Sequence, residues 1–248
     1  GQWPWSRARL AQIVERLADA GARVIAIDLI LAEPDRLSPE SLAAVAAERP
    51  DLAPLVAQLA RQASNDALLA TAIGKAPVVL GFVGESEGGG RAPPAKARFA
   101  SAGDDPLLFA PSFRFAASSL PILLDKASGA GSANWLPQSD QIVRRVPLLV
   151  SSGGTLYPSL ALEAARVGTK ETTLLVRASG ASGLSAFGFS TGIETIRLAG
   201  RTLMTDSNGE MWLRFAGYDA ARSIPAHQVL DNTFDRARIA GKFVLLGV

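Results

Sequence analysis

The residues most able to do chemistry follow the first long apolar run of the chain. Residues 24–31 are almost continuously apolar, which is typical of a strand buried on both faces of a parallel sheet. In such sheets, ligands bind beyond the carboxyl ends of the strands. We therefore predict that the charged side chains at this end bind a small molecule or an ion, and that a later tryptophan or arginine closes the site. The predicted ligand-binding residues are Asp28, Glu33, Asp35, Arg36, Trp135 and Arg144.

A structural role is the alternative for two of these acids. Asp28 falls inside the predicted strand, and a buried carboxylate needs a partner or its pKa rises. Asp28 and Asp35 could instead fix the loop between strand and helix by accepting hydrogen bonds from backbone amides. The sequence leaves both roles open.

A serine hydrolase is the only catalytic arrangement that the residues suggest. The stretch "GESEG" at residues 84–88 matches the G-x-S-x-G pattern of a nucleophile elbow and follows a predicted strand, and the single histidine, His227, comes later in the chain. An elbow must lead directly into a helix, however, and the next residues are "GGRAPPAKAR". This reading is the least favoured, and we expect that the chain is not an enzyme.

The composition excludes several other classes of site. There is no cysteine, so disulfides, thiol catalysis and thiolate metal sites are excluded, and one histidine does not supply an ordinary zinc site. The sequence leaves an oxygen-only calcium or magnesium site open, although it contains no EF-hand spacing, and it contains no phosphate-binding glycine motif. The longest basic run is Arg144-Arg145. We therefore expect no metal, no cofactor and no nucleic-acid partner.

The patterning predicts an α/β fold with a mainly parallel sheet flanked by helices and antiparallel hairpins in the second half. Ser6 is expected to cap the first helix, residues 84–106 to form an exposed loop, and residues 134–136 to pair with 141–150. Asn208-Gly209 is the strongest hairpin signal. The remaining expected helices are residues 39–48, 50–73 with an interruption at 64–66, 120–127, 158–167 and 223–230. The expected strands are residues 24–31, 77–83, 172–177, 193–198, 201–205, 211–216 and 242–247.

An ordered set of segments resembles one known family. "WPWSR", "GARVIAIDLILAEPDRLSPE", "NDALLATAI" and "PVVLG" are followed by "ANWLPQSDQIVRRVPLLV", "YPSLALEAARV", "MWLRFAG", "SIPAHQVL" and "GKFVLLGV". Together they resemble the type-two CHASE domain, an extracellular sensory domain of bacterial cyclases, histidine kinases and related receptors. The resemblance covers almost the whole chain.

The resemblance implies that residues 1–248 form one extracytoplasmic sensory domain on the periplasmic side of the bacterial membrane. Its family pattern includes an upstream strand and downstream transmembrane helices that this sequence does not contain, so the domain would be tethered through flanking helices and would signal to a cytoplasmic cyclase or kinase domain. We expect an unknown small-molecule or ion ligand and a homodimer in the full-length receptor. The alternative is a dimerisation or partner-interaction module that binds no ligand.

Overall fold

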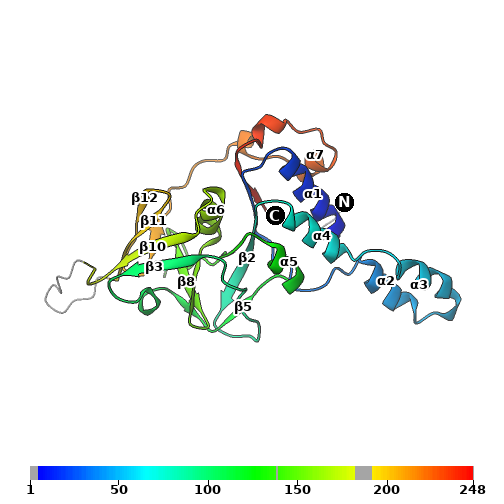
Figure 1. The fold of residues 1–248 in the computed structure, drawn as a ribbon, viewed down its shortest axis with the longest axis horizontal. Helices are drawn as coiled ribbons and strands as arrows, with labels where there is room; N and C mark the ends of the chain where they lie inside the picture. The colour runs from blue at the N-terminus through cyan, green and yellow to red at the C-terminus, as the bar shows by residue number, and fades with distance from the viewer. Residues whose placement is uncertain (1–4, 138, 182–191, 248) are drawn as a thin grey trace.

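The computed structural model describes residues 5–137, 139–181 and 192–247, which form two main sheets with one helix, α6, between them (Figure 1). The first sheet is mainly parallel and lies near the centre of the view, and the second lies at the left. The predicted fold class, a mainly parallel sheet with helices and later antiparallel hairpins, is therefore confirmed.

The first sheet joins the start of the described chain to its end. Its order is β14-β1-β2, and β2 then pairs in parallel with β6 and, further along, antiparallel with β5. The β1 side chains are all buried, because helices cover both faces of the sheet. The strands are β1 (Val24–Ile27), β2 (Val78–Glu85), β5 (Phe115–Ala117), β6 (Gly129–Ser132) and β14 (Phe243–Leu246).

Helices α1, α4 and α5 cover one face of this sheet and form the largest apolar core with it. Helices α2 and α3 project away from the sheets, at the right of Figure 1. The helices are α1 (Arg7–Asp19), α2 (Pro39–Ala46), α3 (Ala53–Leu59), α4 (Asn65–Gly74), α5 (Pro121–Lys126), α6 (Leu160–Gly168) and α7 (Ala226–Leu230), with 3-10 turns η1 (Pro50–Leu52), η2 (Pro106–Leu108), η3 (Ala220–Arg222) and η4 (Arg236–Arg238).

The second sheet has the order β12-β11-β10-β3, in which β3 and β10 are parallel and the other pairs are antiparallel. Two small sheets, β4-β8-β9 and β13-β7, complete the β structure in the described residues. The bounds are β3 (Arg98–Ala102), β4 (Ser112–Phe113), β7 (Arg145–Pro147), β8 (Leu149–Ser152), β9 (Thr155–Pro158), β10 (Thr173–Ala178), β11 (Ile193–Leu198), β12 (Arg201–Met204) and β13 (Glu210–Trp212).

Helix α6 belongs to both halves of the molecule. Leu160 and Ala164 lie one turn apart and pack with Val24, Ala26 and Val79 of the first sheet. Leu162, on another side of the helix, packs in the core of the second sheet. Each half therefore buries a different stripe of the same helix.

Two glycines of β6 allow α6 to approach the first sheet closely. A Cβ atom added at Gly131 would lie 2.6 Å from the Cα atom of Leu160, and one added at Gly129 would overlap the Glu163 carboxylate. Glu163 and Arg166 are both buried and form a bidentate ion pair with N–O distances of 2.6 and 2.7 Å. The small residues of "GAGS" thus make room for a helix that carries a buried charge pair.

Several sequence predictions about local structure were wrong. The predicted loop 84–106 contains β3, which pairs with β10 some seventy residues later in the chain. Residues 134–136 form no strand, and β7 pairs with β13 instead. Asn208-Gly209 lies in a turn, but the strands on either side of it pair with other partners. Two-residue hairpin turns with positive φ at both positions lie instead at Ala199-Gly200, between β11 and β12, and at Gly153-Gly154, between β8 and β9.

Candidate functional site

The loop after β1 is held by a buried polar cluster centred on Asp35, which is only 6% exposed. The Asp35 carboxylate accepts hydrogen bonds from the backbone N–H of Arg7 at 2.8 Å, from the side-chain amide of Asn65 at 2.8 Å and from the backbone N–H of Leu37 at 3.0 Å. Its own backbone N–H donates to Asp66 at 3.0 Å. Asp35 therefore has the structural role that the sequence left open, because its oxygens are occupied by the protein itself.

This cluster connects the first turns of three helices. Arg7 begins α1 and Asn65 begins α4, and both donate to residues of the loop before α2. Ser6 occupies the N-cap position of α1 as predicted, but its side chain makes no capping hydrogen bond; the carboxylate of Asp35 accepts from the Arg7 backbone N–H instead. The Ser38 hydroxyl accepts a hydrogen bond from the backbone N–H of Asn65 at 2.9 Å and donates one to the Glu40 carboxylate at 2.6 Å.

The pKa values of two carboxyl groups in the cluster, those of Asp66 and Glu40, are shifted in opposite directions. Burial raises the pKa of the Asp66 carboxyl, although the Asp35 amide and the positive charge of Arg7 oppose the shift. The Arg7 Nε atom lies 3.7 Å from Asp66 Oδ1, too far for a hydrogen bond. The hydrogen bond from Ser38 lowers the pKa of Glu40. These shifts arise from the packing of helix ends.

The other predicted ligand-binding residues lie on the surface. Asp28 is exposed just beyond β1, so its predicted burial in the strand was wrong, because the strand ends at Ile27. Glu33 and Arg36 are exposed and pair with each other at 3.3 Å. Ligand binding by these residues stays a prediction.

Trp135 and Arg144 lie between β6 and β7 in the chain, and closure of a site by either of them stays a prediction. Trp135 is 60% exposed beyond β6, which is separated from β1 by β2. Arg144 forms a surface ion pair with Asp140 at 2.8 Å. The six predicted residues line neither of the two cavities described below.

The predicted nucleophile elbow at Ser86 is not followed by the helix that such an elbow requires. Ser86 follows β2 in an exposed bend, and residues 86–97 contain no helix. His227 is exposed on α7, which packs against α1. In the described ranges there is also no group of three acidic or histidine side chains that could hold a metal ion.

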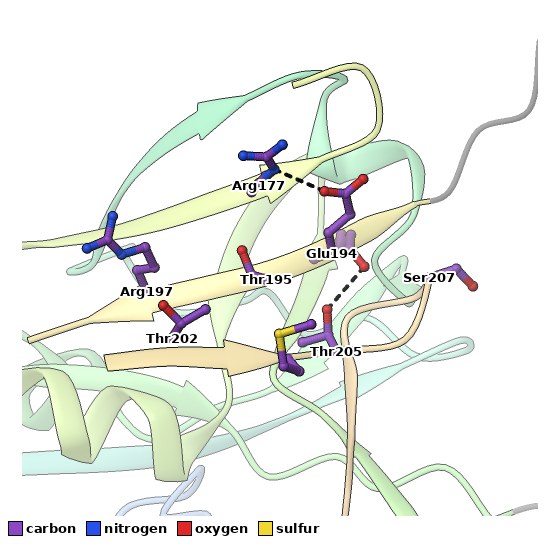
Figure 2. A pocket seen from close by; sticks show the side chains of 9 residues that line it. Arg177, Glu194, Thr195, Arg197, Thr202, Thr205 and Ser207 are labelled. Atoms are coloured by element: carbon purple, nitrogen blue, oxygen red, sulfur yellow. Dashed lines mark hydrogen bonds and ion pairs between the residues drawn. The ribbon is translucent and has the colours of Figure 1, made fainter. Parts of the chain in front are cut away.

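One cavity lies on the outer face of the second sheet, and Figure 2 shows it from close by. It is an open depression of about 680 Å³, and most of its lining residues carry a charged or hydroxyl side chain. Arg177 donates to Glu194 at 3.0 Å across its upper side, and Thr205 donates to the carbonyl of Ile193 at 3.1 Å. Such a shallow polar surface covers little of a bound molecule.

A second cavity, the inter-sheet groove, lies where α6, the hairpin of β11 and β12, β13 and β14 meet. Its volume is about 410 Å³, within the usual range of small-molecule sites. Its walls are mainly apolar, and its polar side chains are two arginines and one threonine. The lining residues are Arg23, Leu148, Ala161, Leu162, Ala165, Thr169, Leu198, Ala199, Arg201, Leu203, Met211 and Phe243.

Sequence reasoning missed this groove because its walls come from segments that are far apart in the chain. The residues predicted to bind a ligand follow the strand ends of a parallel sheet, whereas the groove forms between two sheets. The available signal was α6 itself: Leu160, Ala164 and Val167 mark one stripe, and Leu162 and Ala165 mark another. A helix with two apolar stripes must contact two layers.

The comparisons with known proteins identify the family of the chain. Neither the curated proteins nor the solved structures contain a match. The family model described as "CHASE2 domain" matches residues 1–248, and this family comprises extracellular, non-catalytic sensory domains of signalling receptors. In the described part of the chain, no helix is both long enough and apolar enough to cross a membrane. The match extends over the whole sequence, and the chain therefore belongs to the CHASE2 domain family.

Proposed function

We propose that this chain is the extracytoplasmic sensor of a membrane-bound receptor, that it binds a small molecule in the inter-sheet groove, and that it controls a cytoplasmic cyclase or kinase domain. The family supports the sensory role. The observation that carries the proposed site is that the groove is bounded by elements of both sheets and by α6, the helix packed between them.

The position of the groove gives the ligand a means of changing the domain. A ligand shifts a conformational equilibrium only if it binds one state better than the other. A molecule in the groove contacts β14 of the first sheet and β12 of the second, so its affinity depends on how the two sheets are arranged. Ligand binding and sheet arrangement are thereby coupled, which is the requirement for transmitting a signal.

The experiment is a thermal-shift screen of metabolites and cations on three proteins: the natural chain, Ala161→Trp and Asp28→Asn/Glu33→Gln. Ala161 is an exposed helix residue that lines the groove, so tryptophan there fills the groove without disturbing the core. We expect to find ligands that stabilise the natural chain and Asp28→Asn/Glu33→Gln but do not stabilise Ala161→Trp. Ligands that stabilise the natural chain and Ala161→Trp but not Asp28→Asn/Glu33→Gln would move the site to the loop after β1. If no ligand stabilises the natural chain, the sensor proposal is contradicted.

Output can be measured in the full-length receptor. We expect the ligand found in the screen to change cyclase or kinase activity in membranes that contain the natural receptor, and to have no effect with Ala161→Trp. The control is Arg197→Gln, whose side chain lines the other cavity, so that its basal activity and its response to the ligand should match those of the natural receptor.

A dimerisation module is the second candidate, favoured by the exposed large side chains of residues 204–218. Met204, Trp212, Phe215 and Tyr218 are all exposed in the described structure. Sedimentation velocity of the natural chain and of Phe215→Ser/Tyr218→Ser tests this role. Self-association that the double substitution abolishes and that ligands leave unchanged would favour the interaction module over the sensor.

A further inference from the structure

We propose that the inter-sheet groove accepts an apolar molecule that carries one carboxylate, with Arg201 as the residue that pairs with the carboxylate. This inference rests on the proposed function and adds the chemical class of the ligand. It follows from the different situations of the two arginines at the groove, from the apolar walls, and from the absence of an acidic residue among the lining side chains.

The Nε atom of Arg23 already has an acceptor within the protein. Its Nε atom donates to the carbonyl oxygen of Gly168 at 2.6 Å, and its guanidinium lies 5.7 Å from the centre of the Phe243 ring. Gly168 is the last residue of α6, where unpaired carbonyls give the helix its negative end. Arg23 therefore compensates a partial negative charge that would otherwise repel an anion.

Arg201 is available to a ligand. In the described part of the chain its guanidinium has neither a hydrogen-bond partner nor an ion-pair partner. The register pairs Arg201 with Leu198, a buried residue of the groove wall, so the β-carbons of both residues lie on the inner face of the hairpin. An unpaired guanidinium beside an apolar wall matches a carboxylate joined to an apolar body.

The walls define the rest of the molecule. Leu162, Leu198, Leu203 and Met211 provide aliphatic and thioether surface, and Phe243 provides an aromatic face. Methionine adapts to different shapes, so the walls accept alkyl or aryl groups. No second unpaired cation is needed, because one carboxylate has one unit of charge.

Arg197 provides a matched control on the same hairpin. The register pairs it with Thr202, and both residues line the outer depression in Figure 2 rather than the groove. Replacement of either arginine by glutamine changes the net charge equally. Only the Arg201 substitution removes a cation from the groove.

The test is isothermal titration of octanoate, 1-octanol and octylammonium into the natural chain, Arg201→Gln, Arg197→Gln and Ala161→Trp. We expect saturable binding of octanoate to the natural chain and unchanged binding to Arg197→Gln. Binding should be at least about ten-fold weaker in Arg201→Gln, because a charge-assisted hydrogen bond is lost. Binding should be absent in Ala161→Trp, because the tryptophan fills the groove. Circular dichroism checks that each variant is folded.

The outcomes separate this inference from the sensor proposal. The carboxylate assignment is overturned if octanol or octylammonium binds as tightly as octanoate, or if both arginine variants weaken the binding of octanoate equally. In either case, loss of binding in Ala161→Trp would still support the groove as the binding site. If the natural chain binds none of the three probes, the carboxylate inference is overturned, and the metabolite screen then decides the sensor proposal by itself.

Discussion

Glu163 and Arg166 face each other across one turn of α6 and join both oxygens of the carboxylate to the guanidinium, in a place that solvent does not reach. Arg166 also donates to the carbonyl of Glu171 at 2.8 Å. Because α6 lies between the two sheets, this ion pair is part of the contact between the two halves.

Removal of one partner of this pair should be costly. Glu163→Ala leaves a buried guanidinium without its counter-charge, and we expect a loss of about 3–5 kcal/mol in the free energy of unfolding. Urea denaturation measures it. The double variant Glu163→Gln/Arg166→Met should lose less than the sum of its two single variants; simple additivity would show that the two side chains are not coupled.

The glycine at position 131 should tolerate no side chain. In Gly131→Ala the new methyl group meets the backbone of Leu160 at 2.6 Å, so α6 must move away from β6. We expect a loss of about 1–3 kcal/mol, measured by urea denaturation. Gly89→Ala is the control, because nothing lies within 4 Å of a Cβ atom there; equal effects of the two substitutions would contradict the close contact.

Asp35 should matter for stability much more than its neighbour Glu33. Asp35→Ala removes three hydrogen bonds and leaves the first amide of α1 without its acceptor, so we expect a loss of at least about 2 kcal/mol. Glu33→Gln removes only a surface ion pair and should stay within about 0.5 kcal/mol. Thermal and urea denaturation of both variants compare them; a neutral Asp35→Ala would refute the capping role.

The raised pKa of Asp66 predicts the sign of a pH effect. Its carboxyl ionises less readily in the folded chain than in the unfolded chain, because it is buried. The stability that this group contributes is therefore fully present below its unfolded pKa near 3.9 and is lost as the pH rises through the higher folded value.

Comparison with Asp66→Asn isolates this effect. We expect the stability of the natural chain relative to the variant to increase as the pH is lowered from about 7 toward 4. Urea denaturation at several pH values measures this difference. A difference that is constant across the series would contradict the assigned shift.

Much of the architecture could be predicted from local patterns. The continuous apolar runs at Val24 and Val78 predicted two parallel strands, and the single apolar face of Leu160, Ala164 and Val167 predicted α6. Strand β3 could not be found in this way. Its sequence "RFASA" is short and mostly exposed, and it is a strand because β10, far along the chain, pairs with it.

The site was harder to predict than the fold. Asp35 and Glu33 are both acids of the same loop, yet Asp35 is held by three donors and Glu33 faces solvent. Their difference depends on where α1 and α4 begin in space, because Arg7 and Asn65 are the first residues of these helices, and local sequence does not specify this position. Arg201 carries no motif; only the register of its hairpin distinguishes it from Arg197.

The double burial of α6 has a consequence for folding cooperativity. If either sheet separates from the helix, apolar surface that belongs to the other half is exposed in the same event. The two halves should therefore open together, and the backbone amides of α6 should exchange with deuterium only through global unfolding. Helices α2 and α3, which project from the body and bury few side chains, should exchange far sooner.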